Sequence, residues 1–221
     1  MITNKNYFKA VLFDLDGTLI NSLYDIADSM NRVLVAHNFP THDYEAYRHF
    51  IGRGLKNLSE RVLPEENKNE ETIQAIFHDL MIEYGNNVVN KTVLYNGIPD
   101  LLDALTERGF KMAILSNKAN ELTLKIAIKI LSKWNFSIIL GPRADIPRKP
   151  DPTGANLCRE TLGVAAEQIL YIGDSGIDMQ TAIAAGMFPV GVTWGFRSRE
   201  ELLENGAKAI IDQPMDLTRF L

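Results

Sequence analysis

The sequence predicts an α/β fold in which a doubly wound parallel sheet is interrupted by an all-helical insertion. After Gly97, strand-like apolar runs alternate with helical segments, which is the pattern of βαβ units. Between Ser22 and Val89, apolar residues recur only at helical spacing, and no convincing strand is present. We therefore expect residues 1–18 and 92–221 to form the α/β core and residues 19–91 to form the helical insertion.

The elements of the first half follow from apolar spacing. Residues 9–14 (KAVLFD) form a short apolar run that predicts a buried parallel strand. Three helices should follow, over residues 23–34, over residues 44–62 with an interruption at residues 51–54, and over residues 73–84. The charge run at residues 65–71 (EENKNEE) predicts a solvated loop or helix end.

The second half contains the remaining strands. Pro99 and Gly109 bracket a helix, because proline favours the first turn of a helix and glycine favours the position after its end. Strands are then predicted at residues 111–115, 136–140, 169–172, 189–192 and 209–211.

Composition narrows the possible classes of protein. The net charge of −5 argues against nucleic acid as a partner, although a local site can still bind an anion. No apolar stretch approaches the roughly 18 residues that a membrane span needs. A single cysteine, Cys158, and the lack of a signal-peptide pattern lead us to expect a cytoplasmic protein without disulfides.

Two aspartates, Asp14 and Asp16, lie at the C-terminal end of the first predicted strand, in the segment FDLDGT. Ligands bind at this edge of an open parallel sheet, and the glycine turn can direct both carboxylates into one crevice. Two close carboxylates repel each other unless a cation or a shared proton lies between them. The alternative is a strand-end turn in which aspartate serves only as a cap.

A second pair of aspartates, Asp174 and Asp178, lies in the segment GDSGID after the strand at residues 169–172. Residues four apart share one face of a helix that starts at once, although aspartate at a helix start is commonly only a cap. Two aspartate-rich strand ends of one parallel sheet would converge on one crevice. Clustered carboxylate oxygens suit Mg²⁺, which prefers few carboxylates, several waters and a substrate phosphate.

Two further elements could bind phosphate. Ser116 and Asn117 follow a predicted strand, where a hydroxyl group and the free N–H groups of a turn can bind phosphate oxygens. Lys149 lies in the loop RKPDP, and the two prolines restrict the motion of this loop. Its side chain supplies a positive charge. Taken singly, such residues are common as helix caps or as solvated loop residues.

Together these elements resemble the haloacid dehalogenase superfamily of phosphatases, specifically its phosphoglycolate phosphatase branch. All four family motifs match, namely DLDGT at residues 14–18, SN at Ser116 and Asn117, Lys149, and GDSGID at residues 173–178. The resemblance covers nearly the whole chain. It implies a Rossmann-like core, with the helical insertion as a small cap domain.

The resemblance also implies roles for the acidic residues. Asp14 would be the nucleophile that forms an aspartyl-phosphate, and Asp16 the general acid and base. Mg²⁺ would be held by the Asp14 carboxylate, the backbone carbonyl of Asp16 and Asp174. Lys149 and the metal would keep Asp14 ionised, while Asp178 would orient a water molecule or Lys149 without binding the metal.

Other residues would bind the phosphate or the leaving group. Ser116 and the Asn117 amide would bind phosphate oxygens, and Thr18 would brace Asp16. The cap would exclude water and recognise the leaving group. Candidates for this contact are Arg53 and Lys56 near the glycine-flanked break and, more weakly, Arg197; a surface arginine at a helix bend is the alternative for Arg53.

The leading hypothesis is therefore an Mg²⁺-dependent phosphatase, a monomer or homodimer, that acts on a small phosphorylated metabolite, with 2-phosphoglycolate considered first. Alternatives in the superfamily are a phosphosugar mutase or a phosphatase of sugar phosphates, nucleotides or pyrophosphate. Dehalogenases and phosphonate hydrolases lack the second aspartate, so Asp16 argues against both. A non-catalytic or phospho-accepting signalling module is the alternative of another class, but receiver modules have no helical insertion.

Overall fold

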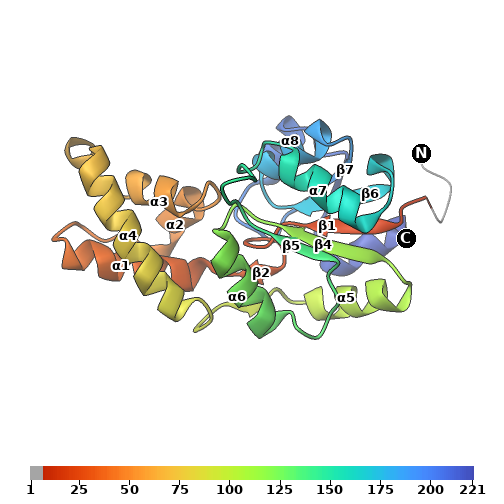
Figure 1. Cartoon of the computed structure of the whole chain (residues 1–221), viewed down its shortest axis with the longest axis horizontal. Coiled ribbons are helices and arrows are strands. Elements are labelled where there is room, and N and C mark those ends of the chain that lie inside the picture. Colours follow the sequence, from red (N-terminus) through yellow and green to blue (C-terminus); the bar gives the residue numbers. More distant parts are fainter. Residues whose placement is uncertain (1–6) are drawn as a thin grey trace.

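The computed structural model describes residues 7–221, and within them six strands form one parallel sheet in the order β5-β4-β1-β6-β7-β8 (Figure 1). The strands are β1 (Ala10–Phe13), β4 (Lys111–Leu115), β5 (Ile138–Leu140), β6 (Ile169–Gly173), β7 (Phe188–Val192) and β8 (Ala209–Ile211). The predicted fold class is confirmed. The strand predicted at residues 136–140 is shorter, because only residues 138–140 pair with β4.

Strand β1 lies inside the sheet between β4 and β6, which explains its uninterrupted apolar sequence. Phe13 at its end is in register with Ile114 of β4 and with Ile172 of β6. The segments that follow these three strands therefore leave the sheet at the same edge. This register brings aspartates far apart in the sequence into one region.

Helices cover both faces of the sheet, as a doubly wound fold requires. Figure 1 shows α7 (Thr153–Leu162) and α8 (Gly176–Ala184) above the sheet, with α5 (Ile98–Glu107) and α6 (Asn120–Ile130) below it. Alternate residues of β1 contribute to two separate cores: Val11 and Phe13 to one, Ala10 and Leu12 to the other. The remaining core elements are α9 (Arg199–Glu204) and the 3-10 helices η2 (Ala166–Gln168) and η3 (Pro214–Phe220).

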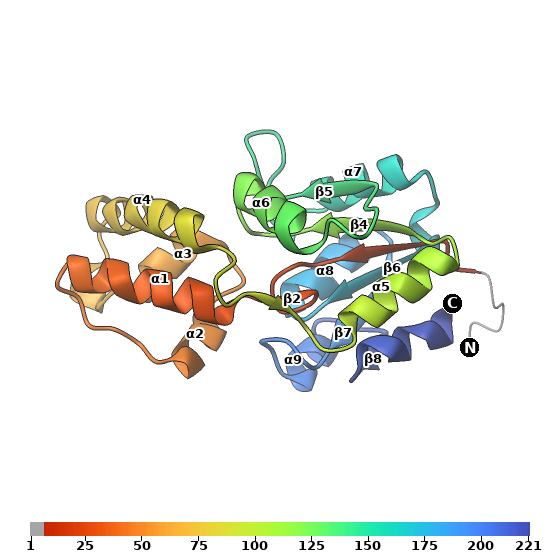
Figure 2. The same ribbon diagram turned by 90° about the horizontal axis from the view of Figure 1, so that it is seen from below.

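The helical insertion, residues 23–87, lies beyond the carboxyl edge of the sheet and is connected to the core by two chain segments (Figure 2). Its elements are α1 (Leu23–Ala36), α2 (Tyr44–Phe50), α3 (Leu55–Arg61), η1 (Glu65–Asn67) and α4 (Glu70–Asn87). The interruption predicted at residues 51–54 separates α2 from α3. Two short strands that the sequence pattern did not reveal, β2 (Ile20–Asn21) and β3 (Val93–Leu94), pair antiparallel in the connecting segments.

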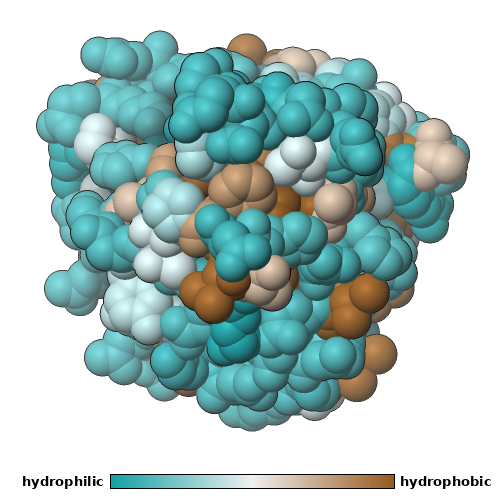
Figure 3. Space-filling model, turned by 90° about the vertical axis from the view of Figure 1, so that its left-hand side faces the viewer, coloured by the Kyte–Doolittle hydropathy of each residue, from teal (hydrophilic) through white to brown (hydrophobic). Residues whose placement is uncertain are grey.

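The apolar stripes of the insertion point inward. Met30, Leu34, Ile76 and Leu80 are fully buried, and the outer end of the insertion is mainly hydrophilic with scattered hydrophobic side chains (Figure 3). Among the described residues, no helix is both long and apolar enough to cross a membrane.

Asp25 of α1 connects the two chain segments that link the insertion to the core. Its buried carboxylate accepts hydrogen bonds from the backbone N–H groups of Asn90, Lys91 and Thr92, and from the Thr92 hydroxyl group at 2.7 Å. A carboxylate that satisfies several buried N–H groups stabilises a fold more than an exposed ion pair does. This residue therefore fixes the return of the chain after α4.

We expect Asp25→Ala to lower the free energy of unfolding by about 3 kcal/mol, because it leaves several buried donors unsatisfied. Asp28→Ala is a matched control one turn further along α1, where Asp28 binds Lys91 and Tyr44 at the surface. It should cost at most about 1 kcal/mol. Urea unfolding measures both values, and equal losses would contradict the structural role given to Asp25.

Candidate active site

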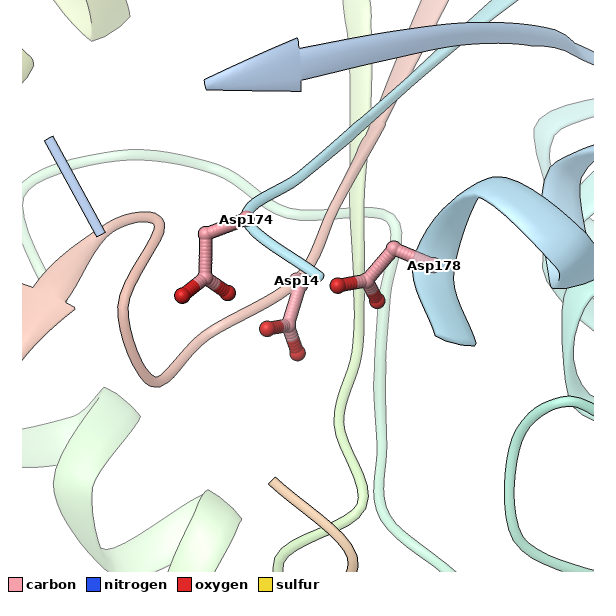
Figure 4. A group of neighbouring side chains, drawn as sticks. All are labelled: Asp14, Asp174 and Asp178. Atoms are coloured by element: carbon pink, nitrogen blue, oxygen red, sulfur yellow. The ribbon is translucent and has the colours of Figure 1, made fainter. Parts of the chain in front are cut away.

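Three aspartates, two from the loops after β1 and β6 and one from the first turn of α8, form the centre of the candidate site. Asp14, Asp174 and Asp178 are buried, and one carboxylate oxygen of each lies within 4.8 Å of the others. Figure 4 shows Asp14 between Asp174 and Asp178, with the carboxylate of Asp178 directed toward Asp14. The predicted convergence of two aspartate-rich strand ends is confirmed.

Glycine at positions 17 and 195 allows two loops to approach Asp174 closely. A Cβ atom on Gly17 would lie 2.2 Å from Asp174 Oδ2, and Gly17 has a φ of +89° that favours glycine. A Cβ atom on Gly195 would lie 2.3 Å from the Cβ atom of Asp174. The Phe196 backbone N–H group donates to Asp174 Oδ2 at 2.7 Å. Backbone from two loops therefore closes directly around this carboxylate.

Lys149 lies between two of the three aspartates. Its buried Nζ donates to Asp14 Oδ1 at 2.7 Å and to Asp178 Oδ1 at 2.6 Å. The other oxygen of Asp178 accepts hydrogen bonds from the Ser175 hydroxyl and backbone N–H groups at the start of α8. Both oxygens of Asp178 are thus occupied, as expected of a residue that holds Lys149 in position.

The side chain of Asn117 positions the backbone of Lys149. Its Oδ1 accepts a hydrogen bond from the Lys149 N–H group at 2.8 Å, and its Nδ2 donates to the Lys149 carbonyl at 3.2 Å. The side-chain amide is therefore turned toward this loop, and only the backbone N–H group of Asn117 remains for a phosphate oxygen. The Ser116 hydroxyl accepts a hydrogen bond from the Lys118 N–H group, and Ser116 lines the adjacent cavity.

Burial and mutual repulsion shift the pKa values of these groups. Burial, reinforced by Asp178, raises the pKa of Asp174 to about 7. Burial also raises the pKa of Asp14 well above its usual value. Lys149 lowers this pKa, but it only partly offsets burial and the charges of Asp178 and Asp174. Burial alone would lower the pKa of Lys149, but Asp14 and Asp178 raise it well above its usual value. The site thus contains more buried negative charge than one lysine can balance.

This excess of charge fits a divalent cation. Within residues 7–221, Asp14 Oδ2 and Asp174 Oδ1 accept no hydrogen bond, although the other oxygen of each carboxylate does. Oxygen ligands of this kind bind hard divalent cations such as Mg²⁺. The structure therefore brings together the two carboxylates that the sequence assigned to the metal.

Asp16 is held by residues that the sequence analysis did not identify. Its Oδ1 accepts hydrogen bonds from Lys118 Nζ at 2.6 Å and from the Ser22 hydroxyl group. The predicted contact between Thr18 and Asp16 is absent. Thr18 N–H donates to the Leu15 carbonyl in a tight turn, and within residues 7–221 the buried Thr18 hydroxyl has no hydrogen-bond partner. The charged residue directly after the SN motif was the signal that could have revealed Lys118.

A small cavity of about 50 Å³ lies at the centre of this site. Its polar wall comes from the core and includes Asp14, Asp16, Ser116, Lys118 and Lys149. Its apolar wall comes mainly from the insertion, with Ile26, Ile51, Leu55 and Leu58, and is completed by Phe196 of the core. A substrate bound here would be enclosed between the two parts of the molecule.

The basic residues predicted to contact a leaving group have different surroundings. Arg53 lies in an adjacent cavity of about 390 Å³, together with Arg61 and Arg197. Arg197 lines both cavities, and its guanidinium group donates to the backbone carbonyls of Arg48 and Ile51, joining the core to the insertion. Lys56 forms a surface ion pair with Glu70 at 2.8 Å and lines neither cavity, so its surroundings do not support the predicted contact.

Carboxylates and a lysine at the carboxyl edge of a doubly wound sheet, beneath a helical insertion, define a hydrolytic α/β enzyme. The model of the haloacid dehalogenase-like hydrolase family matches residues 11–192. The chain therefore belongs to this family, as its motifs predicted.

Similar proteins narrow the class further. The chain is 30% identical over 220 residues to a phosphoglycolate phosphatase of Haemophilus influenzae (strain 86-028NP), covering 97% of this chain and 98% of that protein. It is 32% identical to the phosphoglycolate phosphatase of Aquifex aeolicus over 213 residues, which cover 96% of each chain. A crystal structure of a predicted phosphoglycolate phosphatase from Haemophilus somnus has a TM-score of 0.88 at 30% identity, covering 96% of this chain and 97% of that one. These similarities confirm the prediction of a phosphatase.

The raised pKa of Asp174 predicts how pH changes the stability of the metal-free protein. This carboxyl group has a pKa of about 7 in the folded protein and an ordinary pKa of about 3.8, so the folded state binds more protons at pH values between these two. The titration of Asp174 should therefore reduce the stability of the metal-free protein as the pH rises from about 4 to 7. A cation should restore this stability once the proton is gone, so Mg²⁺ should raise the melting temperature more at about pH 8 than at about pH 5.5.

Differential scanning fluorimetry with and without Mg²⁺ measures this effect. Asp174→Asn should remove most of the Mg²⁺-induced shift and flatten the pH dependence. Asp145→Asn, which changes an exposed aspartate outside the site, should leave both unchanged. An equal Mg²⁺-induced shift at the two pH values would contradict the assignment.

Proposed function

We propose that the protein is an Mg²⁺-dependent phosphomonoester hydrolase that acts on a small phosphorylated metabolite through an aspartyl-phosphate on Asp14. The observation that carries this proposal is the buried arrangement in which Lys149 joins Asp14 to Asp178, while Asp14 keeps one oxygen without a hydrogen bond. A carboxylate fixed in this way is oriented for attack on phosphorus.

In the first step, a carboxylate oxygen of Asp14 attacks phosphorus and the bond to the leaving-group oxygen breaks. Asp16 donates its proton to that oxygen, so the leaving group departs as an alcohol. In the second step, water attacks the phosphorus of the aspartyl-phosphate, Asp16 takes a proton from this water, and the bond between Asp14 and phosphorus breaks. Phosphate is released, and both carboxylates return to their starting states.

The remaining residues neutralise and position the transferring phosphoryl group. Lys149, the Ser116 hydroxyl and the backbone N–H group of Asn117 would bind its oxygens. Mg²⁺, held by Asp14 and Asp174, would neutralise negative charge on the phosphoryl oxygens. The apolar wall contributed by the insertion would exclude bulk water, so we propose that the insertion acts as a cap.

The arginines that line the adjacent cavity favour a leaving group that carries its own negative charge. The two cavities share Gly52, Ser175 and Arg197, so a leaving group can extend from the first cavity toward Arg53. Guanidinium groups bind carboxylates through paired hydrogen bonds. A short carboxylate leaving group such as glycolate fits this arrangement, which favours 2-phosphoglycolate over neutral sugar phosphates.

We expect Mg²⁺-dependent phosphate release from wild-type protein and a loss of at least about 10³-fold in Asp14→Asn, because the nucleophile is removed. Asp145→Asn serves as the control and should keep full activity. In Asp16→Asn, intact-protein mass spectrometry after brief exposure to 2,4-dinitrophenyl phosphate, whose leaving group needs no proton, should detect one added phosphoryl group. Retained turnover in Asp14→Asn would refute the covalent mechanism.

Substitution of Arg53 should change substrate preference more than chemistry. Arg53→Met should lower kcat/KM for 2-phosphoglycolate about tenfold or more, because a charged hydrogen bond to the leaving group is lost. It should change kcat/KM for ethyl phosphate, which has no carboxylate, by less than about twofold. Lys56→Met is the matched control in the same segment and should affect neither substrate. Equal losses on both substrates would count against the proposed contact.

A further inference from the structure

Lys118 is a second buried lysine in the site, and it connects the core to the insertion. Its side chain is 2% exposed. Nζ donates to Asp16 Oδ1 at 2.6 Å and to the hydroxyl oxygen of Tyr84 at 2.7 Å, and it lies 4.9 Å from the centroid of the Tyr84 ring. Asp16 belongs to the loop after β1, whereas Tyr84 belongs to α4 of the insertion and is fully buried. One ammonium group thus binds both parts of the molecule.

The hydrogen bonds to Asp16 distinguish its two oxygens. Oδ1 accepts from both Lys118 and Ser22, whereas Oδ2 accepts no hydrogen bond within residues 7–221. A proton on this carboxyl group must lie on Oδ2, because Oδ1 already faces two donors. The anchored oxygen therefore sets the direction in which the other can give or take a proton.

Stability alone does not explain a lysine at this position. Burying an ammonium group has a large desolvation cost, and an apolar side chain of similar length often replaces a buried ion pair without loss of stability. Methionine would fill much of the same space. The charge is better explained by what it does to Asp16.

We propose that Lys118 is a positioning residue for Asp16, and that its hydrogen bond to Tyr84 makes this positioning depend on the insertion being seated on the core. This inference rests on the proposed role of Asp16 as general acid and base. Lys118 itself need not touch the substrate. When α4 moves away from the core, Lys118 loses its hydrogen bond to Tyr84. Its ammonium group is then held less firmly, and so is the Asp16 oxygen to which it donates.

The test uses phosphomonoesters whose leaving groups need different amounts of protonation. The constant kcat/KM covers the steps up to transfer of the phosphoryl group to Asp14, in which Asp16 protonates the leaving oxygen. An alkyl leaving group needs this proton, whereas 2,4-dinitrophenolate leaves without it. Lys118→Met should therefore lower kcat/KM about 10²-fold for alkyl phosphates and less than about threefold for 2,4-dinitrophenyl phosphate.

Tyr84→Phe tests the connection to the insertion. It keeps the ring but removes the hydroxyl group, and should lower kcat/KM for alkyl phosphates about tenfold with little effect on the dinitrophenyl ester. Tyr47→Phe is the matched control, because Tyr47 is equally buried and its hydroxyl binds Asn31 at 2.7 Å within the insertion. It should leave both substrates within about twofold of wild type.

A double substitution separates positioning from a general structural role. In an Asp16→Asn background, Lys118→Met should cause no further loss of kcat/KM for alkyl phosphates, because Lys118 acts through Asp16. A uniform loss on all substrates, an additive double substitution, or Tyr84→Phe behaving like Tyr47→Phe would overturn the proposal. If Lys118→Met does not fold, the comparison of the two tyrosine variants decides. An inactive wild-type protein would instead refute the proposed function.

Discussion

The burial of several carboxylates at one edge of a sheet is the constraint on which the rest of this structure depends. The parallel register of β1 and β6 forces Asp14 and Asp174 into the same region, where their charges repel each other and lack water. Lys149 compensates part of this charge and is itself fixed by the side chain of Asn117. Glycine at position 17 lets the loop after β1 approach Asp174 closely. Each of these features would be unnecessary if the carboxylates were exposed.

Two buried lysines give identical acidic side chains different surroundings. Lys149 donates hydrogen bonds to Asp14 and Asp178, whereas Lys118 donates to Asp16 and to the hydroxyl oxygen of Tyr84. In both Asp14 and Asp16, one oxygen is anchored and the other accepts no hydrogen bond within the described part of the chain. Separate environments of this kind allow like residues to take different roles, one as nucleophile and one as proton donor. The different roles proposed for Asp14 and Asp16 thus follow from the lysine to which each carboxylate is hydrogen-bonded.

The sequence predicted the parts of the site that follow from strand ends, and not those that depend on contacts between distant side chains. Asp14 and Asp174 were identifiable because parallel strands end at one edge of a sheet, whereas Lys149 was identifiable through its proline-rich loop and the family resemblance. The partners of Asp16 were not, because Lys118 lies 102 positions away and the tight turn excludes Thr18 from the role expected of it. Local spacing also cannot reveal which basic side chains of the insertion turn toward the core. The short strands β2 and β3, with two residues each, carry no periodic signal at all.

The site is complete only where the insertion meets the core. Arg197 donates to backbone carbonyls of Arg48 and Ile51 at the end of α2, and Lys118 donates to Tyr84 of α4, so contacts in different places hold the insertion to the core. Ile51 and Leu55 then form an apolar wall above charged groups that become more strongly coupled as water is excluded. Hydrogen bonds that hold the insertion in place therefore also determine the polarity around the carboxylates. In the proposed mechanism, recognition of the leaving group and orientation of the proton donor both depend on this interface between insertion and core, which would couple substrate fit to the chemical step.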